Sequence, residues 1–214
     1  MIYKNFISFL KNRAIELMGL CLIFIALLLT ASFFSYSPSD PTFIYGVDNV
    51  KINNLLGVYG SIISDFLLQS FGLTSFLILI TILLWGISLV IKKEIKKIKL
   101  KIFYLFIYIF FTCVLISATY NDSFWLIDNG NSGFIGQILY KEIKNVLPLA
   151  SHDSAIFFFI VISTSFFILS SNINFKYFLV VIKKIFKRNN TTDNQISINE
   201  NQSEDLIDQN LIIE

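Results

Sequence analysis

The stretch Phe34-Ser35-Tyr36-Ser37-Pro38-Ser39-Asp40-Pro41 marks the point at which a long apolar run of this sequence ends. After it comes a loop rich in proline, aspartate and asparagine. Two prolines three residues apart cannot continue a helix, because each lacks an N–H donor and pushes the residue before it toward extended geometry. Helix and hydrophobicity therefore stop together, as expected where a membrane helix leaves the bilayer.

The composition of the 214 residues is that of a membrane protein. Hydrophobic residues make up 55% of the chain, charged residues only 15%, and the mean hydropathy is +0.68. A soluble domain is closer to half apolar and about a quarter charged. The formal net charge of +2 carries little information, because the charges are segregated along the chain.

Four apolar runs fit a bilayer core about 30 Å thick, which takes roughly 20 helical residues. They cover residues 15–34, 73–91, 102–120 and 155–171, and together predict a membrane domain over 15–171. The first run follows a basic lead, residues 1–14, as the apolar core of a signal peptide would. It is longer than the roughly 7–15 residues of such a core, so an uncleaved anchor is the favoured interpretation.

The loops after the first and third spans each contain a candidate amphipathic helix. Residues 57–71 have Ile62, Ile63 and Phe66 on one side and Ser61 and Ser64 near the other. Residues 134–147 also have one apolar side, although Glu142 falls on it without an explanation. Both segments suit helices that lie in the membrane interface. The predicted fold class is therefore all-α integral membrane, with four transmembrane helices and interfacial helices in the external loops.

Beyond the last span, residues 172–188 are basic and partly apolar, and residues 189–214 are polar and acidic. The basic segment is expected to lie along the membrane surface, because anionic lipids attract each Lys or Arg there by about 1 kcal/mol. The acidic segment cannot bury enough apolar surface to offset its chain entropy. It is predicted to be a disordered C-terminal tail and the start of a linker.

The placement of lysine and arginine predicts the orientation. Fourteen of the seventeen basic residues lie in 1–14, 92–101 and 172–188, and the two intervening loops hold only Lys51, Lys141 and Lys144. Both termini are therefore expected in the cytoplasm. The six lysines of 92–101 could bind nucleic acid in principle, but their position directly between two spans favours a topology signal and contact with lipid headgroups.

The sequence contains no recognisable catalytic or metal site. The phosphate-binding pattern GxxxxGK[ST] is absent, because none of the nine glycines is followed by lysine. His152 has no nearby Cys, Glu or pair of Asp residues with which to share a metal ion, and Cys21 and Cys113 are interpreted as small buried apolar residues. No span carries a charge in its interior, which weighs against a proton-coupled transporter or an ion pump. The chain is expected not to be an enzyme and to bind no cofactor.

The opening stretch resembles part of a known family. Residues 35–41 are similar to the SYSPSDP element that follows the first span in the FtsK/SpoIIIE family of bacterial DNA translocases. Residues 54–65 resemble that family's N-L-x-G-x-x-G-A-x-x-A-D element, with serine where alanine is common, and Phe71-Gly72 matches as well. Residues 132–136 are a weaker match to SGG-x-I-G. The family-motif residues are thus Ser35, Tyr36, Ser37, Pro38, Ser39, Asp40, Pro41, Asn54, Gly57, Gly60, Asp65, Gly72, Gly133 and Gly136.

The resemblance covers roughly residues 14–171 and implies an inner-membrane anchor at the division septum. It implies a linker to a hexameric ATP-driven motor that pumps double-stranded DNA, a homo-oligomer, septal protein partners, and contact with DNA only through the motor. Walker motifs and a winged-helix domain are absent from these residues. ATP and Mg²⁺ are therefore expected only with a motor attached or supplied in trans, and this chain is expected to anchor and oligomerise such a translocase.

Two alternatives stay open. A small multi-pass channel or transporter subunit would need polar positions that face one another in the spans, and the few candidates are Thr81, Ser88, Thr112, Ser117 and residues 163–165. A stand-alone septal scaffold would have no link to a translocase. No GxxxG pattern lies inside a span to predict close helix packing.

Overall fold

The computed structural model describes residues 2–42, 51–126, 128–148 and 152–172, and their side chains from Phe6 onward. The chain divides into two compact units, Met1–Asn172 and Ile173–Glu214, and every described residue lies in the first. The predicted tail 189–214, and all of the basic segment 172–188 except its first residue, lie outside the described residues.

Six α-helices and no strand form the described part of the chain. They are α1 (Ile2–Phe34), α2 (Gly57–Phe71), α3 (Thr74–Lys92), α4 (Ile98–Thr119), α5 (Gly133–Val146) and α6 (Asp153–Ser170). The helices α1, α3, α4 and α6 are long and apolar enough to cross a membrane. The predicted all-α membrane fold with four spans and two shorter helices is therefore confirmed.

The boundaries of two spans differ from those predicted. Helix α1 begins at Ile2, so the basic lead 1–14 continues the first span as one helix of 33 residues. Such a helix is about 50 Å long, which exceeds the thickness of a bilayer core. Helix α4 begins at Ile98 instead of Ile102, which brings two further lysines into its first turns.

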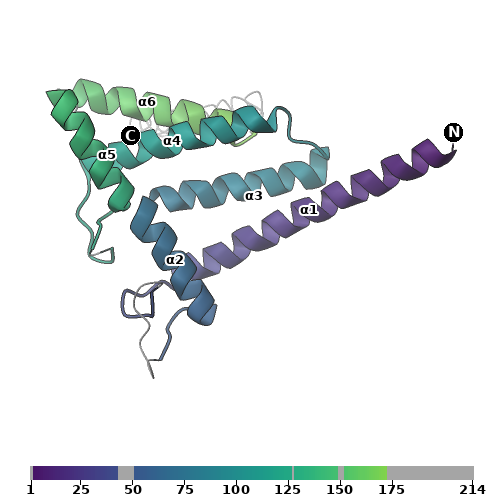
Figure 1. Ribbon diagram of the computed structural model, residues 1–214, viewed down its shortest axis with the longest axis horizontal. Coiled ribbons are helices and arrows are strands. Elements are labelled where there is room, and N and C mark those ends of the chain that lie inside the picture. Colours follow the sequence, from purple (N-terminus) through teal and green to yellow (C-terminus); the bar gives the residue numbers. More distant parts are fainter. Residues whose placement is uncertain (1, 43–50, 127, 149–151, 173–214) are drawn as a thin grey trace, which may run out of the picture. The chain divides into compact units, whose positions relative to one another are not determined.

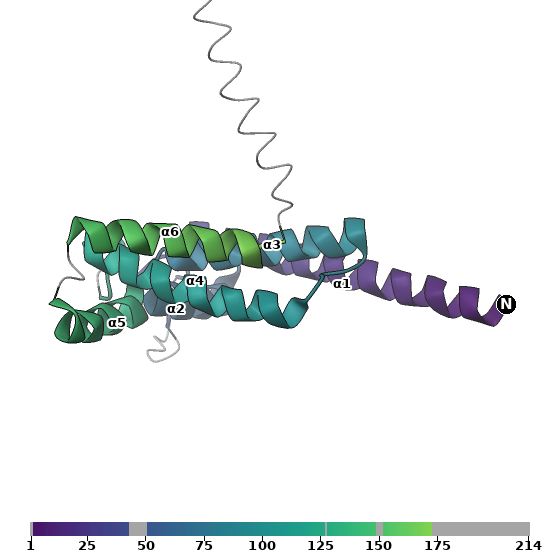
Figure 2. The same cartoon turned by 90° about the horizontal axis from the view of Figure 1, so that it is seen from above.

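Two pairs of helices form the core. Helix α1 packs along α3, and α4 packs along α6, as Figures 1 and 2 show. Helix α2 contacts α1 and α3 near the end of α1, and α5 packs on α4 and touches α2 (Figure 1). We call this end of the spans the loop end, and the opposite end, where residues 93–97 join α3 to α4, the lysine end.

One glycine on each helix lets α1 and α3 approach closely. A Cβ on Gly86 would lie 2.9 Å from the carbonyl oxygen of Gly19, and a Cβ on Gly19 would lie 2.8 Å from that of Gly86. In membranes small residues at an interface allow such close packing. The sequence has no GxxxG in a span, and a pair of single glycines on two helices cannot be recognised from spacing along one of them.

The lysine end is fastened by polar contacts. Glu16, the charge at the edge of the first span, pairs with Arg13 on its own helix and with the ammonium of Lys93 at 2.9 Å. The indole N–H of Trp85 donates to the carbonyl oxygen of Ser170 at 2.8 Å, so α3 is also tied to the end of α6.

Buried hydroxyls join the spans at mid-length. Thr81 of α3 and Tyr108 of α4 share a hydrogen bond of 2.9 Å, and Thr112 of α4 bonds to Ser163 of α6. All four side chains are buried. Among the polar positions named for a channel, Thr112 and Ser163 face each other and Thr81 faces Tyr108, and each of these four hydroxyls has its partner on the neighbouring helix.

Thr81→Val should destabilise the protein by about 1–2 kcal/mol, because the Tyr108 hydroxyl would then be buried without that partner. Thr81→Val combined with Tyr108→Phe should cost less than the sum of the two single substitutions, since no orphaned hydroxyl remains. Unfolding in mixed micelles of mild detergent and SDS measures the four free energies. Strict additivity would show that the hydrogen bond contributes nothing.

Candidate functional site

Eight of the fourteen family-motif residues lie in two clusters at the loop end, and the other six are Tyr36, Ser37, Pro38, Ser39, Gly57 and Asp65. The Asp40 cluster lies between α1 and α2 and contains Ser32, Ser35, Asp40, Pro41, Asn53, Asn54, Gly60, Ser61 and Ser64. The glycine junction lies where α2 meets α5 and contains Gly72, Asn121, Asn131, Ser132, Gly133 and Gly136.

The carboxylate of Asp40 closes the loop that follows α1. Only 4% of this residue is exposed. One oxygen accepts the backbone N–H of Asn53 at 2.9 Å and its side-chain amide at 3.1 Å, and the other accepts the backbone N–H of Asn54 at 2.8 Å. Hydrogen bonds to an ionised acceptor are stronger than neutral ones, so Asp40 fixes where the chain returns to begin α2.

The buried amide of Asn54 joins this loop to both helices. Its Nδ2 donates to the carbonyl oxygen of Ser32 at 2.9 Å and lies 3.4 Å from the hydroxyl of Ser64. Its Oδ1 accepts the N–H of Leu56 at 3.1 Å. A Cβ on Gly60 would lie 2.2 Å from that same Oδ1. Only glycine therefore leaves room at position 60 for the asparagine amide.

Serine at the two positions where alanine is common in the family gains hydrogen bonds. The hydroxyl of Ser61 donates to the carbonyl oxygen of Pro41 at 2.6 Å, and that of Ser64 donates to the oxygen of Gly60 at 2.8 Å. Ser35 accepts the N–H of Leu55 at 3.0 Å. The remaining serines of residues 35–41, Ser37 and Ser39, bond to each other at 2.8 Å, and Ser39 and Pro38 are exposed.

A chain of polar side chains runs from the end of α1 to the loop before α5. The hydroxyl of Tyr36 donates to Oδ1 of Asp65 at 3.3 Å and accepts the amide of Gln69 at 3.0 Å. Gln69 in turn accepts the amide of Asn129 at 2.9 Å, and Gln137 of α5 donates to the carbonyl oxygen of Asn129 at 2.8 Å. These hydrogen bonds connect Tyr36, just after α1, through Asp65 and Gln69 of α2 to the loop before α5.

Burial changes the acidity of two groups in this chain. It raises the pKa of Tyr36 to about 12, so its hydroxyl stays protonated at physiological pH. Burial also raises the pKa of Asp65, and the charge of Asp128 adds to this, while the hydrogen bond from Tyr36 opposes it. The folded protein therefore binds the Asp65 proton more tightly than the unfolded chain does.

Asp65→Asn should make the stability less dependent on pH. Because the pKa of Asp65 is higher in the folded state, wild-type stability should rise as the pH falls toward that pKa and fall as the pH increases. Melting temperatures measured in detergent between about pH 7 and pH 4 should therefore slope less in Asp65→Asn than in wild type. Asp122→Asn, at an exposed residue, is the matched control and should keep the wild-type slope. Equal slopes in all three proteins would contradict the assignment.

At the glycine junction two backbones meet without space for side chains. Gly72 has φ +57, and a Cβ there would lie 2.0 Å from the carbonyl oxygen of Asn131. The same oxygen accepts the N–H of Leu73 at 2.8 Å. Gly133 has φ +66, and its Cβ would lie 2.6 Å from the oxygen of Ser70. Both the left-handed backbone and the close approach require glycine at these positions.

Asn121 organises the loop on the α5 side of the junction. Its Oδ1 accepts the N–H of Ser132 at 3.1 Å, and its carbonyl oxygen accepts the N–H of Asn131 at 2.9 Å. Sequence reasoning missed Asn121, Asn131 and Gln69, because single polar residues in loops follow no periodic pattern. It named Gly57, whose N–H donates to the carbonyl oxygen of Asn54 at 2.9 Å. The φ of Gly57 is +64, but nothing lies within 4 Å of an added Cβ, so only its backbone conformation favours glycine.

The two clusters use their polar groups on the fold itself. Within the described ranges, every buried side-chain N or O atom has a hydrogen-bond partner. In the same part of the chain, no three His, Cys, Asp or Glu side chains come together as a metal site would require. What the arrangement does is hold α2 and α5 rigidly at one end of the four spans.

Comparison with known proteins agrees with this architecture. Residues 11–179 match the family described as the 4TM region of DNA translocase FtsK/SpoIIIE. The chain is similar to proteins named DNA translocase FtsK from Rickettsia bellii (30% identical over 137 residues, 64% of this chain), Azospirillum brasilense (32% over 90 residues, 42%) and Rickettsia prowazekii (38% over 77 residues, 36%). These alignments span only 17%, 14% and 10% of the respective relatives. No solved structure matches the chain significantly.

Proposed function

Because the chain belongs to the FtsK/SpoIIIE family of DNA translocases through its four-span membrane region, we propose that it anchors such a translocase in the bacterial inner membrane at the division septum. It would assemble with copies of itself, hold cytoplasmic cargo at the membrane, and present its loop end to septal proteins. The observation that carries this proposal is the family match over residues 11–179, which includes most of the first span and all of the other three. The work is spatial and mechanical, and bilayer contact through the spans is its physical basis.

Charge distribution supports an orientation with both termini in the cytoplasm. The lysine end carries exposed Lys92, Lys93, Lys96, Lys97 and Lys99, whereas both intervening loops together carry three lysines. Positive charge is retained on the cytoplasmic side of bacterial membrane proteins. Alkaline phosphatase fused after residue 130 should be active and GFP fused there should be dark, with the reverse result for fusions after residue 95. A fluorescent GFP fusion after residue 130 would contradict the orientation.

The ATP-driven motor, its Mg²⁺ and its contact with DNA would belong to a domain attached to this one or supplied by a second chain. The short share of each relative that aligns with this chain supports that division of labour. The gene sequence past the codon for Glu214 should encode GxxxxGK[ST], or a separate motor protein should co-purify with this domain. A motor found by neither route would leave an anchor without a translocase.

A channel or transporter subunit is less well supported. Among the polar span residues, Thr81, Tyr108, Thr112 and Ser163 bond to one another across helix interfaces and so serve helix packing. Proteoliposomes containing the purified chain should show the same leak of small ions as empty liposomes. A conductance above that background would favour the channel over the anchor.

A further inference from the structure

The first unit of the protein contains one arrangement twice: a span, a short helix at the loop end, and a second span. The halves are α1-α2-α3 and α4-α5-α6 (Figure 1). Both short helices begin with Gly-x-x-Gly, at Gly57 and Gly60 in α2 and at Gly133 and Gly136 in α5. The first glycine has φ +64 in one half and +66 in the other, and the second glycine is buried in both.

The loop before each short helix is also closed by a side-chain oxygen that accepts a backbone N–H, three residues before Gly57 in one half and one residue before Gly133 in the other. In the first half a side-chain oxygen of Asp40 accepts the N–H of Asn54 at 2.8 Å. In the second half the side-chain oxygen of Asn121 accepts the N–H of Ser132 at 3.1 Å. The first span of each half ends in a similar stretch, Leu-Leu-Thr-Ala-Ser at 28–32 and Leu-Ile-Ser-Ala-Thr at 115–119. Glycine spacing, backbone angles and loop closure thus agree that the two halves are structural repeats.

Inside the chain, two helix contacts join the halves, in addition to the hydrogen bond from Trp85 to Ser170 at the lysine end and the one from Asn129 to Gln69 at the loop end. The C-terminal end of α2 meets the N-terminal end of α5 at the glycine junction, and α3 contacts α4. A joint of this kind uses one edge of each half. The opposite edges are the N-terminal end of α2 with α1 in the first half, and the C-terminal end of α5 with α6 in the second.

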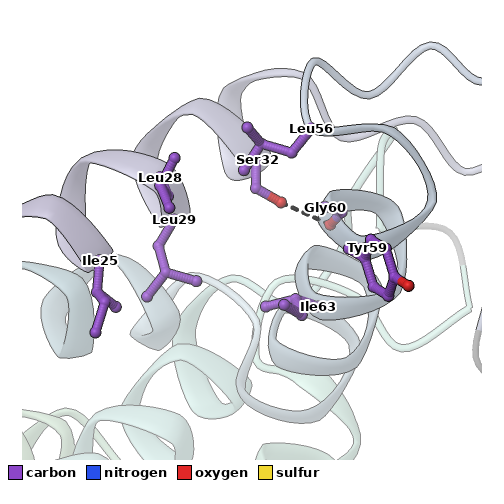
Figure 3. A pocket seen from close by; sticks show the side chains of 8 residues that line it. All are labelled: Ile25, Leu28, Leu29, Ser32, Leu56, Tyr59, Gly60 and Ile63. Carbon is purple, nitrogen blue, oxygen red and sulfur yellow. Dashed lines mark hydrogen bonds between the residues drawn. The ribbon is translucent and has the colours of Figure 1, made fainter.

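An apolar groove lies at each of these two edges. The α1–α2 groove has a volume of about 390 Å³, and Figure 3 shows Ile25, Leu28 and Leu29 from α1 and Tyr59, Gly60 and Ile63 from α2 around it. The α5–α6 groove has a volume of about 540 Å³ and is lined by Ile143, Leu147, Phe158 and Phe159 together with Phe110 and Phe111 of α4. Tyr59 is 81% exposed and Leu147 is 59% exposed.

We propose that the two grooves are the two sides of one interface between copies of this chain, in which the α1–α2 groove of one copy receives the α5–α6 edge of the next. In this contact two copies would meet in the same way as the two halves meet inside each copy, with the C-terminal end of one short helix against the N-terminal end of another. This inference rests on the proposed self-assembly and gives its geometry. Because the two surfaces differ, the contact is head to tail, and such contacts build rings or open chains instead of closed two-fold dimers.

A second copy fits these edges better than lipid alone does. Both grooves lie at the same end of the spans, where α2 and α5 are fixed by hydrogen bonds, so they present preformed surfaces at one level of the membrane. The inner edge of each half, formed by the C-terminal end of α2 with α3 in one and by the N-terminal end of α5 with α4 in the other, is already covered by the other half of the same chain. Lipid acyl chains occupying the grooves would be the alternative, and the experiment distinguishes the two.

Cross-linking in membranes tests the proposal. Cys21, which is exposed and not buried as its sequence context predicted, is replaced by serine, and Cys113, which is buried as predicted, is kept. Copies with Tyr59→Cys and copies with Leu147→Cys, carrying different tags, are co-expressed and treated with a flexible bis-maleimide. The expected product joins Tyr59→Cys of one copy to Leu147→Cys of another, and chains with both cysteines should give a ladder of products. Phe103→Cys, at an exposed position near the lysine end, should not cross-link to either.

Three results would overturn the inference. Cross-links between two Tyr59→Cys copies, or between two Leu147→Cys copies, would show a two-fold contact while self-assembly stands. Oligomers trapped by a lysine-reactive reagent without any maleimide product would show that the grooves hold lipid and that assembly uses another surface. Monomers with both reagents would overturn the proposed self-assembly as well. As an independent check, Ile63→Trp should fill the α1–α2 groove and reduce the trapped oligomers several-fold, with the monomer still folded.

Discussion

Asp40→Ala should reduce the free energy of unfolding by about 1–3 kcal/mol, because the buried backbone N–H of Asn54 would lose its acceptor and such a loss costs about 1–3 kcal/mol. The backbone N–H of the exposed residue Asn53 would lose the same acceptor but can turn to water. The donors are the amides of Asn53 and Asn54, at 2.9 and 2.8 Å from the carboxylate. Asp40→Asn should be nearly as harmful. Asparagine replaces one carboxylate oxygen with an NH₂ group, which would face the backbone N–H of Asn53 or Asn54 and could not accept it.

The matched control for Asp40 is Asp122→Ala, because Asp122 also lies in the loop after a span but is exposed. Thermal unfolding of the three purified variants in detergent gives the comparison. Asp122→Ala should have the melting temperature of the wild type, and both Asp40 variants should have clearly lower melting temperatures. Wild-type stability of Asp40→Ala would show that the carboxylate does not close the loop after α1.

Gly72→Ala is expected to be the most damaging small substitution in the second cluster. Its methyl group would lie 2.0 Å from the carbonyl oxygen of Asn131, which is backbone and cannot rotate away, and the left-handed φ of +57 adds strain. Overpacking and strain together should cost about 3 kcal/mol or more. The joint between the two halves would then open, so limited proteolysis should cut within residues 120–132.

Gly57→Ala separates the two causes. Gly57 has a similar φ of +64 but nothing within 4 Å of an added Cβ, so only the backbone strain of about 1 kcal/mol should appear. Melting temperature and proteolysis pattern measured side by side should rank wild type, Gly57→Ala and Gly72→Ala in falling order of stability. Equal effects of the two alanines would mean that the close approach of Gly72 to Asn131 is not rigid.

The spans could be predicted from the sequence because a bilayer demands length and apolarity, and Pro38 and Pro41 mark where the first one ends. The burial of the short helices was harder to predict. In α2 the small and polar residues Gly60, Ser61 and Ser64 are buried, while Phe66 is 61% exposed. A helix at a membrane can turn its apolar side outward, since lipid replaces water there. Glu142 is exposed on α5 although it lies on the apolar side, and this exchange of apolar faces does not explain it.

Contacts between distant segments could not be predicted from one sequence. Nothing in the spacing of Gly19 and Gly86 indicates that they meet, and nothing near Asn121 indicates that it closes the turn before α5. The family motifs named Asp40, Asn54, Gly60, Gly72 and Gly133 without their partners. The structure supplies the reason for each of these residues, which is either a carboxylate or amide that closes a loop or a backbone approach that only glycine permits.

The central claim is that these residues anchor a translocase at the division septum, and the position of the chain in dividing cells tests it most directly. Residues 1–214 carrying a fluorescent protein at the cytoplasmic C-terminus should be imaged at native expression level, alongside a general membrane dye. We predict a band at midcell in constricting cells that is strongly enriched over the dye. A uniform outline that follows the dye at every stage of division would contradict the claim.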